Sequence, residues 1–352
     1  MSQPKQTSTK KKGTKKQPAD WPVNNGPIDL ALHDLPHESS TLECWNQNCH
    51  LATIQGRHFS LFASFTRTVI GKDEHTGEAI YMHSVSWALT DTDNQKYYPD
   101  SLADRADALV SNTTLQLEID HNSFQKIQEG KYQLKLYNPG TGVGCELNFM
   151  PFVNPVLHGN NGLVTGTRGE ELFYYFIPAC EVNGTITLPG GESFDVEGCG
   201  WYDHRFGKPK TARAKKQQLS LNWFSIQLDN NWQITAYELY DTNNQPALFE
   251  THKPPAARWA ILIDPGGNAA TLHDFQLTPG ETWTSARTFI AYPTQWRLTI
   301  PEYYTELDIH SPLPDQEVIT VVDKPAFWQG RVQIKGNFGK RSVNGLGYVE
   351  RS

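Results

Sequence analysis

GTITLPGGESFDVEGCGWYDH at residues 184–204 returns in altered form as GRVQIKGNFGKRSVNGLGYVE at residues 330–350. Each copy begins with glycine, runs through an alternating strand, a glycine turn and a second strand, and closes on Gly-x-Gly-aromatic-x-acid. The alignment matches Trp201 with Tyr348 and Asp203 with Glu350. A repeated unit of this kind predicts two related structural units in one chain.

The sequence around the repeat has the period-2 alternation of β-strands. HFSLFASFTRTVI (58–70) and AIYMHSVSWALTD (79–91) are two examples, separated by the turn GKDEHTGE (71–78). Many further short strands follow, divided by turn residues. We expect one helix, over PDSLADRADALV (99–110), with Asp100 or Ser101 as its N-cap. Many short strands with very little helix predict an all-β fold of antiparallel barrels or sandwiches.

The repeat also suggests where the two units begin and end. WNQNCHL from Trp45 loosely parallels WFSIQL from Trp223, so each half opens on a Trp strand and closes on the Gly-aromatic-acid strand. We expect a Lys-rich tail over 1–25, an N-terminal β-domain over 26–210 and a C-terminal β-domain over 215–352. The basic segment KPKTARAKK (208–216) joins them.

Charge and hydropathy exclude several classes of protein. The first sixteen residues carry six lysines and no acid; with a net charge of −7 for all 352 residues, the rest of the chain carries −13. An acidic body argues against nucleic-acid binding. We find no 20-residue apolar run and no apolar core of a signal peptide, which favours a cytoplasmic protein. The Lys-rich tail is expected to be solvated, with peripheral contact to an anionic membrane surface as the alternative.

The sequence predicts neither a metal nor a cofactor. Cys44, Cys49 and His50 lie close together, but no second ligand pair with zinc spacing follows. The five cysteines show no pairing pattern, which favours reduced thiols. The glycine signatures of nucleotide-binding loops and the GxSxG and HExxH motifs are absent from the sequence.

The segment GCGWYDHRFG (198–207) concentrates candidate chemistry on one strand. Alternation places Trp201 and Asp203 on one face and Tyr202 and His204 on the other, although the glycines could introduce a bulge that resets this parity. An Asp desolvated among aromatic rings would stay protonated at neutral pH and could protonate an alkene. The alternative is structural: Asp203 forms a salt bridge with Arg205 or caps a turn.

Other candidates lie on neighbouring predicted strands. His83 and Trp87 share a face, where His83 is either a core histidine or part of a cavity wall. Glu43 beside Trp45 is too polar for a simple core and could join a hydrogen-bond network with the Asp203 strand. DTDN (91–94) superficially resembles an acid motif of class II terpene cyclases, but it occurs where a turn is expected.

Several of these segments occur in the order found in one family. Glu-Cys-Trp at 43–45, FSLFASFTR, YMHSVSWALTD, GCGWYDHRFG, LNWFSIQL, FWQGRVQIKG and GLGYVE together resemble the hydroxyneurosporene synthase and AttH-type lipocalin-like proteins over most of residues 39–350. The resemblance implies two tandem lipocalin-like domains, a hydrophobic substrate and no cofactor. It also spans several activities, including carotenoid 1,2-hydratases, kievitone hydratase-like enzymes, fungal Diels–Alderases and a cyanobacterial meroterpenoid cyclase.

The departures from the family pattern bear on which activity to expect. The carotenoid hydratases carry a His-x-Trp pair where this chain has Tyr174 and Phe176, which puts water addition in doubt. Asp203 matches the Asp of the hydratase strand. Trp328-Gln329-Gly330 replaces the common Trp-Glu-Gly, and Cys44 replaces a Trp in Glu-Trp-Trp. Either change could reshape the pocket.

These observations predict a cofactor-independent cyclase of an isoprenoid or meroterpenoid chain, started by an acid. A pericyclase, a hydratase and a non-catalytic carrier of a hydrophobic metabolite are the alternatives. Asp203 is the expected proton donor, with Asp107 on the predicted helix as a substitute, and His204 or Glu43 is expected to orient the acid. The expected substrate-binding residues are Trp45, His83, Trp87, Tyr174, Phe176, Trp201, Tyr202, Trp223 and Trp328.

Overall fold

The computed structural model describes residues 18–23, 26–104, 108–111, 113–159, 161–209, 219–241, 255–320 and 326–352. Within them the protein is almost entirely antiparallel β-sheet, and the one helical piece is the 3₁₀ turn η2 (Pro301–Tyr303). The described part of the chain holds no helix with the length and apolarity needed to cross a bilayer. Of the tail expected over 1–25, residues 1–17 and 24–25 lie outside the described residues, as do most of the 208–216 segment and Asp107. Residues 18–23 are described, and the expectation of a solvated tail is wrong there, because Trp21 is buried.

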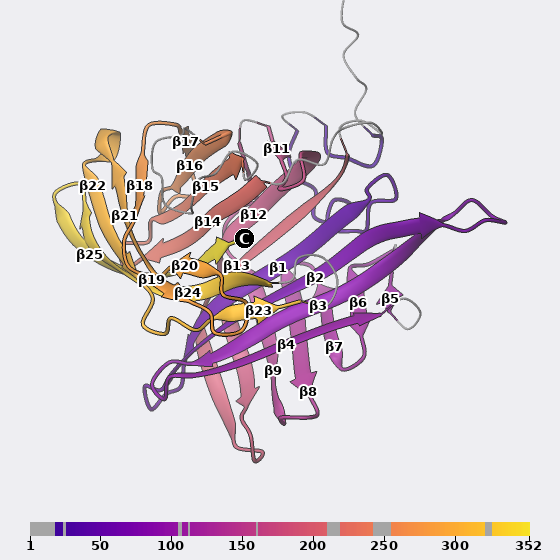
Figure 1. The fold of residues 1–352 in the computed structure, drawn as a ribbon, viewed down its shortest axis with the longest axis horizontal. Helices are drawn as coiled ribbons and strands as arrows, with labels where there is room; N and C mark the ends of the chain where they lie inside the picture. The colour runs from indigo at the N-terminus through magenta and orange to yellow at the C-terminus, as the bar shows by residue number, and fades with distance from the viewer. Residues whose placement is uncertain are drawn as a thin grey trace, which may run out of the picture.

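The first sheet contains all strands from 42 to 209 and is strongly curled (Figure 1). Its strands are β1 (Leu42–Ala52), β2 (His58–Lys72), β3 (Ala79–Asp91), β4 (Lys96–Asp104), β5 (Leu109–Val110), β6 (Gln116–Ile119), β7 (Asn122–Gln128), β8 (Lys131–Asn138), β9 (Val143–Pro151), β10 (Val156–Leu157), β11 (Leu163–Thr165), β12 (Glu170–Thr187) and β13 (Ser193–Pro209).

The second sheet and a small hairpin use residues from 219 onward. Their strands are β14 (Leu219–Leu228), β15 (Gln233–Asp241), β16 (Ala257–Ile263), β17 (Ala269–Leu272), β18 (Gln276–Pro279), β19 (Thr282–Thr284), β20 (Ala291–Pro293), β21 (Gln295–Ile300), β22 (Thr305–His310), β23 (Glu317–Ile319), β24 (Ala326–Phe338) and β25 (Arg341–Arg351). The separate hairpin is β19–β20.

The two sheets have the same strand order, as the sequence repeat predicts. The first runs β3-β2-β1-β13-β12-β9-β8 and the second β16-β15-β14-β25-β24-β22-β21. In each, the strand that carries the glycine-aromatic-acid motif pairs with the first strand of its own sheet. The motif glycines permit this pairing, because a Cβ at Gly198 would lie 2.0 Å from the His50 carbonyl oxygen and one at Gly345 would lie 2.6 Å from that of Gln227.

Two expectations about local structure are wrong. Residues 99–104, expected to be helical, belong to the edge strand β4, which pairs with β3 from Lys96 to Asp104. Pairing with a long neighbouring strand outweighs a helical pattern of only three turns. The proposed match of Trp45 with Trp223 is displaced by one residue, because Asn46 pairs with Asp203 whereas Trp223 pairs with Glu350. The two tryptophans therefore point to opposite faces of their sheets.

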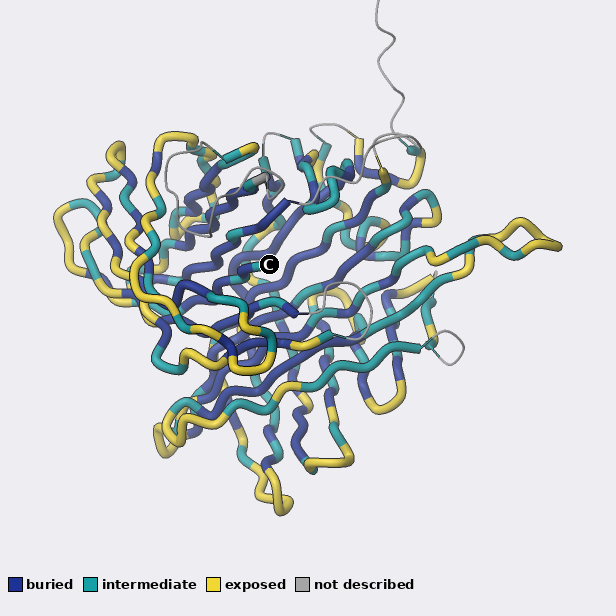
Figure 2. Tube along the Cα trace, in the orientation of Figure 1, coloured by how far each residue is buried: buried dark blue, intermediate teal, exposed yellow. Residues whose placement is uncertain are grey.

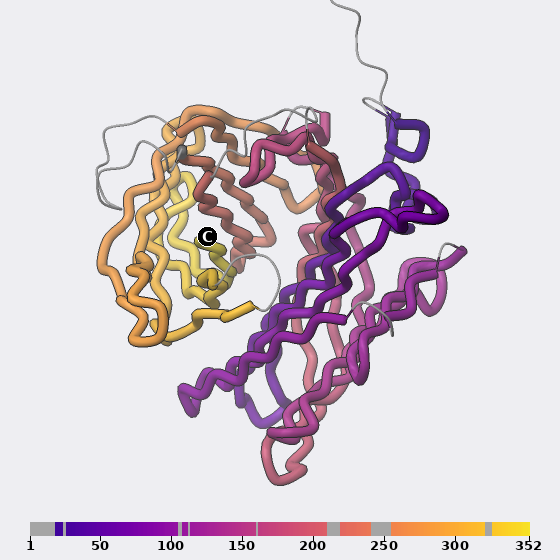
Figure 3. The backbone as a smooth tube through the Cα atoms, turned by 45° about the vertical axis from the view of Figure 1, so that its right-hand side comes forward, coloured from indigo at the N-terminus to yellow at the C-terminus, as the bar shows by residue number. Residues whose placement is uncertain are grey.

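Apolar side chains form three layers. One cluster fills the concave side of the first sheet and includes Trp45, Trp87 and Tyr202. A second fills the concave side of the second sheet, around Trp328. A third lies between the convex faces of the two sheets, where Trp201 contacts Trp223 edge to face. Figure 2 shows buried backbone running through both sheets, and Figure 3 shows them side by side.

The N-terminal segment closes the concave side of the first sheet. Trp21 belongs to its apolar cluster, and Ile28 and Leu30 pack against that cluster. The Asp34 carboxylate, with no exposed surface, accepts hydrogen bonds from the hydroxyls of Tyr132 (2.5 Å), Tyr175 and Tyr202 (3.0 Å). The space that a lipocalin uses for its ligand is thus filled by side chains here, which directs attention to the junction of the sheets.

Candidate active site between the two sheets

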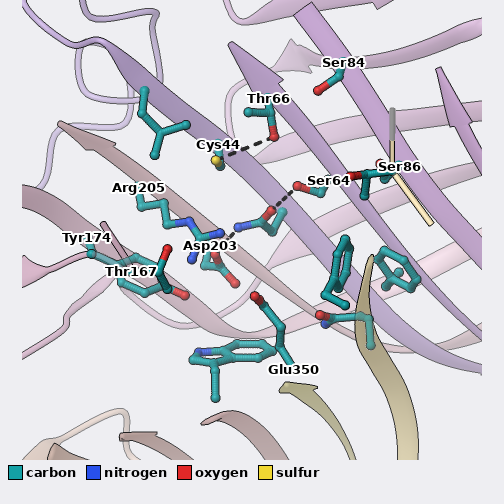
Figure 4. Close-up of a pocket in the computed structure, with 18 of the residues that line it drawn as sticks. Cys44, Ser64, Thr66, Ser84, Ser86, Thr167, Tyr174, Asp203, Arg205 and Glu350 are labelled. Atoms are coloured by element: carbon teal, nitrogen blue, oxygen red, sulfur yellow. Dashed lines mark hydrogen bonds between the residues drawn. The ribbon is translucent and has the colours of Figure 1, made fainter. Parts of the chain in front are cut away.

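A cavity of about 140 Å³ lies between the convex face of the first sheet and the second sheet (Figure 4). One wall is polar and carries the hydroxyls of Ser64, Thr66, Thr68, Ser84, Ser86 and Ser101 on β2, β3 and β4. An aromatic wall is formed by Trp223, Tyr237 and Phe327 of the second sheet, and Phe62 and Tyr174 of the first sheet extend it. The cavity therefore offers an apolar surface and a hydrogen-bonding surface to the same ligand.

Asp203 lies in this cavity and is only 1% exposed. It belongs to β13, where the register places it opposite Asn46 of β1. The Asn46 Nδ2 donates to Asp203 Oδ1 over 2.7 Å, and the Ser64 hydroxyl donates to Asn46 Oδ1 over 2.6 Å. Asn46 is thus held in one orientation from the hydroxyl wall and in turn holds the Asp203 carboxyl.

Burial raises the pKa of Asp203 from 3.8 to about 7. The hydrogen bond from Asn46, the positive charge of Arg205 and a hydrogen bond with Tyr174 oppose this rise, while the negative charge of Glu350 adds to it. A carboxyl group with a pKa near neutrality exists in both protonation states at working pH. It can donate a proton and recover it, which an ordinary surface Asp does not do efficiently.

The parity predicted for β13 is confirmed. Trp201 and Asp203 face the junction of the sheets, whereas Tyr202 and His204 face the core of the first sheet. The expectation that His204 or Glu43 orients Asp203 is therefore wrong, because both lie on the other side of the sheet. Asn46, which the sequence did not single out, contacts the acid instead.

Glu43 and His204 form a buried charge network of their own. The Glu43 carboxylate bonds with His204 Nε2 at 3.0 Å, His37 Nδ1 at 2.7 Å and Arg67 Nη2 at 2.9 Å. Burial alone would raise the pKa of Glu43, but the hydrogen bonds from His204 and His37 outweigh it and hold the pKa at about 2. His204 Nδ1 continues the network to the Tyr175 hydroxyl at 3.1 Å.

His37, Glu43 and His204 are also the one group of the described residues whose ligand atoms are close enough to hold a metal ion. Their separations of 2.7 and 3.0 Å are those of direct hydrogen bonds. The Arg67 guanidinium already neutralises Glu43 and would repel a divalent ion in the same core. We assign this cluster to the hydrogen-bonded core.

The structure distributes the predicted substrate-binding residues over three places. Tyr174 and Trp223 line the cavity beside Asp203. Phe176 and Trp201 stack on each other, with ring centroids 4.9 Å apart, behind the cavity wall. Trp45, Trp87 and Tyr202 are packed in the core of the first sheet and Trp328 in that of the second, while His83 lines a narrow space beside Trp45. The main cavity is therefore not lined by seven of the predicted residues: Trp45, His83, Trp87, Phe176, Trp201, Tyr202 and Trp328.

The histidine whose expected place in the sequence is taken by Tyr174 has a spatial counterpart in His158. His158 follows β10 and stacks on Tyr174 with ring centroids 4.0 Å apart, and its Nδ1 accepts a hydrogen bond from Trp259 Nε1 at 3.3 Å. Burial lowers the pKa of His158 to about 3, so the ring is a weak base at neutral pH. Sequence patterning missed it because β10 is only two residues long.

Cys44, Cys49 and His50 are not brought together. Cys44 lines the cavity, Cys49 is buried in the core of the first sheet, and His50 bonds through Nδ1 with the Ser60 hydroxyl at 2.9 Å. All five cysteines are free thiols. Residues 91–94 form the turn that was expected, and Asp91 accepts a hydrogen bond from Arg57 at 2.6 Å.

A wider groove of about 860 Å³ lies further along β1 and β13, near His50 and Cys199. Its two aspartates already accept hydrogen bonds from loop backbone: Asp264 accepts from Gly266 N and Asn268 N, and Asp229 accepts from Asn344 N. We place the reaction site in the smaller cavity, because a buried carboxyl group with a strongly raised pKa faces an aromatic wall there.

The free energy of unfolding should depend on pH through Asp203. Because its pKa is raised from 3.8 to about 7, the stability present below pH 3.8 is lost as the pH rises through 7. The loss amounts to about 4 kcal/mol, since each pKa unit corresponds to about 1.4 kcal/mol. Denaturant titrations at pH 4 and pH 8 should show that the free energy of unfolding falls by about 4 kcal/mol more in the wild type than in Asp203→Asn. Equal losses would contradict the burial of an ionisable Asp203.

One family profile and several solved structures match most of this chain. The AttH-like family profile matches residues 6–351. An AttH protein from Nitrosomonas europaea, NE1406, superposes with a TM-score of 0.74 at 21% identity and covers 94% of this chain and 98% of its own. Kievitone hydratase from Nectria haematococca superposes with a TM-score of 0.73 at 17% identity over 94% and 95% of the two chains.

A more distant structure shares the same architecture. CghA, solved with Sch210972, superposes with a TM-score of 0.56 at 11% identity and covers 88% of each chain. No curated protein matches the sequence. At these identities the structural likeness establishes a shared lipocalin-like fold.

Proposed function

The chain belongs to the AttH-like family, and from this premise we propose that it is a cofactor-independent cyclase of a hydrophobic isoprenoid or meroterpenoid substrate. The observation that carries the proposal is the Asp203 carboxyl, which is buried, faces an aromatic wall and has a pKa near 7. A proton donor of this kind starts a cation reaction on an alkene, and the rings of the wall stabilise the cation through their π faces.

The two walls of the cavity support a substrate with two different ends. Trp223, Tyr237 and Tyr174 present ring surface to a hydrocarbon chain. The row of serine and threonine hydroxyls on β2, β3 and β4 presents donors and acceptors to an oxygen-bearing group. A prenylated phenol or similar meroterpenoid precursor would satisfy both surfaces, whereas a purely hydrocarbon chain would leave the hydroxyls without ligand partners.

Water addition is the second candidate, because kievitone hydratase shares the fold. The hydroxyl wall could hold a water molecule near the substrate. The nearest histidine to Tyr174 is too weak a base to activate that water, since burial lowers the pKa of His158 to about 3. The site therefore favours quenching of the cation by ring closure and proton loss.

We would test the proposal by incubating the purified protein in heavy water with prenylated phenols and linear polyenes, followed by mass spectrometry. A cyclic isomer with one non-exchangeable deuterium is expected, because the proton from Asp203 equilibrates with solvent before transfer. An isomer without deuterium would indicate a pericyclase, and a product heavier by one water would indicate a hydratase. Binding without any conversion would favour a carrier.

A further inference from the structure

Glu350 is the counterpart of Asp203 in the second copy of the repeat, and it lines the same cavity. It belongs to β25, where it pairs with Trp223 on one side and Gln329 on the other. Figure 4 shows the Glu350 side chain directed from the second sheet toward Asp203 on the first. The repeat thus brings two carboxyl groups, one from each sheet, to a single cavity.

We propose that Glu350 is the second acid–base group of this site and takes up the proton that the substrate cation loses after Asp203 has started the reaction. The inference rests on the proposed function, because it assigns the end of the same reaction. The proposed site needs both sheets, since the first sheet supplies Asp203 and the second supplies Glu350.

Burial assigns the two roles. Asp203 is 1% exposed and Glu350 is partly exposed, so Asp203 is the more desolvated of the two carboxyl groups. Two neighbouring carboxyl groups of unequal burial share their charge unequally, with the more buried group protonated and the other ionised. The titratable and charged groups that line the cavity around Asp203 come from several elements. They are Cys44 on β1, Tyr174 and Glu170 on β12, Arg205 on β13, Tyr237 on β15, Glu350 on β25, and Arg168 in the turn before β12.

Arg205 balances the pair. Its guanidinium interacts with both Asp203 and Glu350, and its pKa stays well above the usual range although burial acts to lower it. One cation and one carboxylate leave the centre neutral while Asp203 is protonated. This balance favours the state in which one acid holds a proton and the other is ready to accept one.

The proposed sequence of steps conserves atoms and charge. The Asp203 O–H proton forms a new C–H bond with one alkene carbon, which leaves a carbocation on the substrate and a carboxylate on Asp203. After ring closure, a C–H bond beside the cation breaks, its electrons form a C=C bond, and its proton goes to the Glu350 carboxylate. Proton exchange with solvent then restores both groups, and the net reaction is an isomerisation.

The first experiment needs no substrate. Carboxyl carbon NMR should show Asp203 titrating near pH 7 in the wild-type protein. In Glu350→Gln the midpoint should fall by about one pH unit, because the neutral amide no longer repels the Asp203 carboxylate. Glu306→Gln, an exposed substitution of the same kind on β22, should leave the midpoint unchanged. An unchanged midpoint in Glu350→Gln would overturn the pairing.

The second experiment follows the products in heavy water. Glu350→Gln should still incorporate deuterium, because Asp203 still starts the reaction, but the cyclic isomer should fall at least about tenfold relative to water-quenched products. An unchanged product distribution would overturn the role of Glu350 as acceptor. If the wild-type protein converts no substrate, the proposed function fails, while the titration still decides whether the two carboxyl groups are paired.

Discussion

Asp203→Asn should lower the rate of turnover by about 10³-fold, the usual contribution of a positioned general acid. An amide has nearly the shape of a carboxyl group but no proton acidic enough to transfer to an alkene. The hydrogen bond from Asn46 Nδ2 can be kept by the new amide oxygen, so the cavity should retain its shape. The free energy of unfolding at pH 5 should therefore change by only about 1 kcal/mol.

Turnover and unfolding should be measured on the same preparation, with Asp195→Asn as the matched control. Asp195 lies on the same strand, β13, but is exposed and does not line the cavity. The control should keep wild-type turnover and stability. Full activity of Asp203→Asn would remove Asp203 from the mechanism. A loss of activity accompanied by unfolding would assign Asp203 to the structure of the sheet junction instead.

Asp34→Ala should lower the free energy of unfolding by about 4 kcal/mol, the range for removing one partner of a buried charge network. The substitution leaves the hydroxyls of Tyr132, Tyr175 and Tyr202 without their shared acceptor inside the first sheet. It also releases the N-terminal segment, which this carboxylate fastens to the core. Each unsatisfied buried hydroxyl costs about 1–3 kcal/mol, and partial rearrangement of the tyrosines limits the sum.

Equilibrium denaturation at pH 7 would measure this effect. Asp29→Ala is the matched control, because Asp29 lies on the same segment, is exposed and accepts a hydrogen bond from the nearby Ala31 N–H. It should cost less than about 1 kcal/mol. Asp34→Asn should fall between the two, since its amide oxygen can still accept from one or two tyrosines. A loss below 1 kcal/mol in Asp34→Ala would show that the tyrosines find other partners.

The alternation of residues was sufficient to predict the all-β fold. It also placed Asp203 and His204 on opposite faces of β13, which the structure confirms. The repeat predicted two related units, and the matching strand orders of the two sheets agree with it. These properties could be predicted because a strand's side chains alternate strictly and because the motif glycines are required wherever the last strand approaches its neighbour closely.

The helix expected at 99–110 shows where local patterning fails. Residues 99–104 belong to the edge strand β4 along β3, and residues 109–110 form β5; the pairing partner of β4 is a segment that the local pattern does not include. The same limit applies to the grouping of tryptophans. Trp45, Trp87 and Trp223 look equivalent in sequence, yet the first two fill a core and only Trp223 reaches the cavity.

The sequence by itself determined the strands, the repeated motif and the acid at its end, because these follow from periodicities within one segment. The tertiary structure alone decided that the N-terminal segment closes the concave side of the first sheet, that Asn46 rather than His204 holds Asp203, and that Glu350 lines the same cavity. Each of these depends on register between strands far apart in the chain and on the packing of one sheet against the other. Such contacts depend on the free energy of the whole fold, so the sequence of a single segment is not enough to predict them.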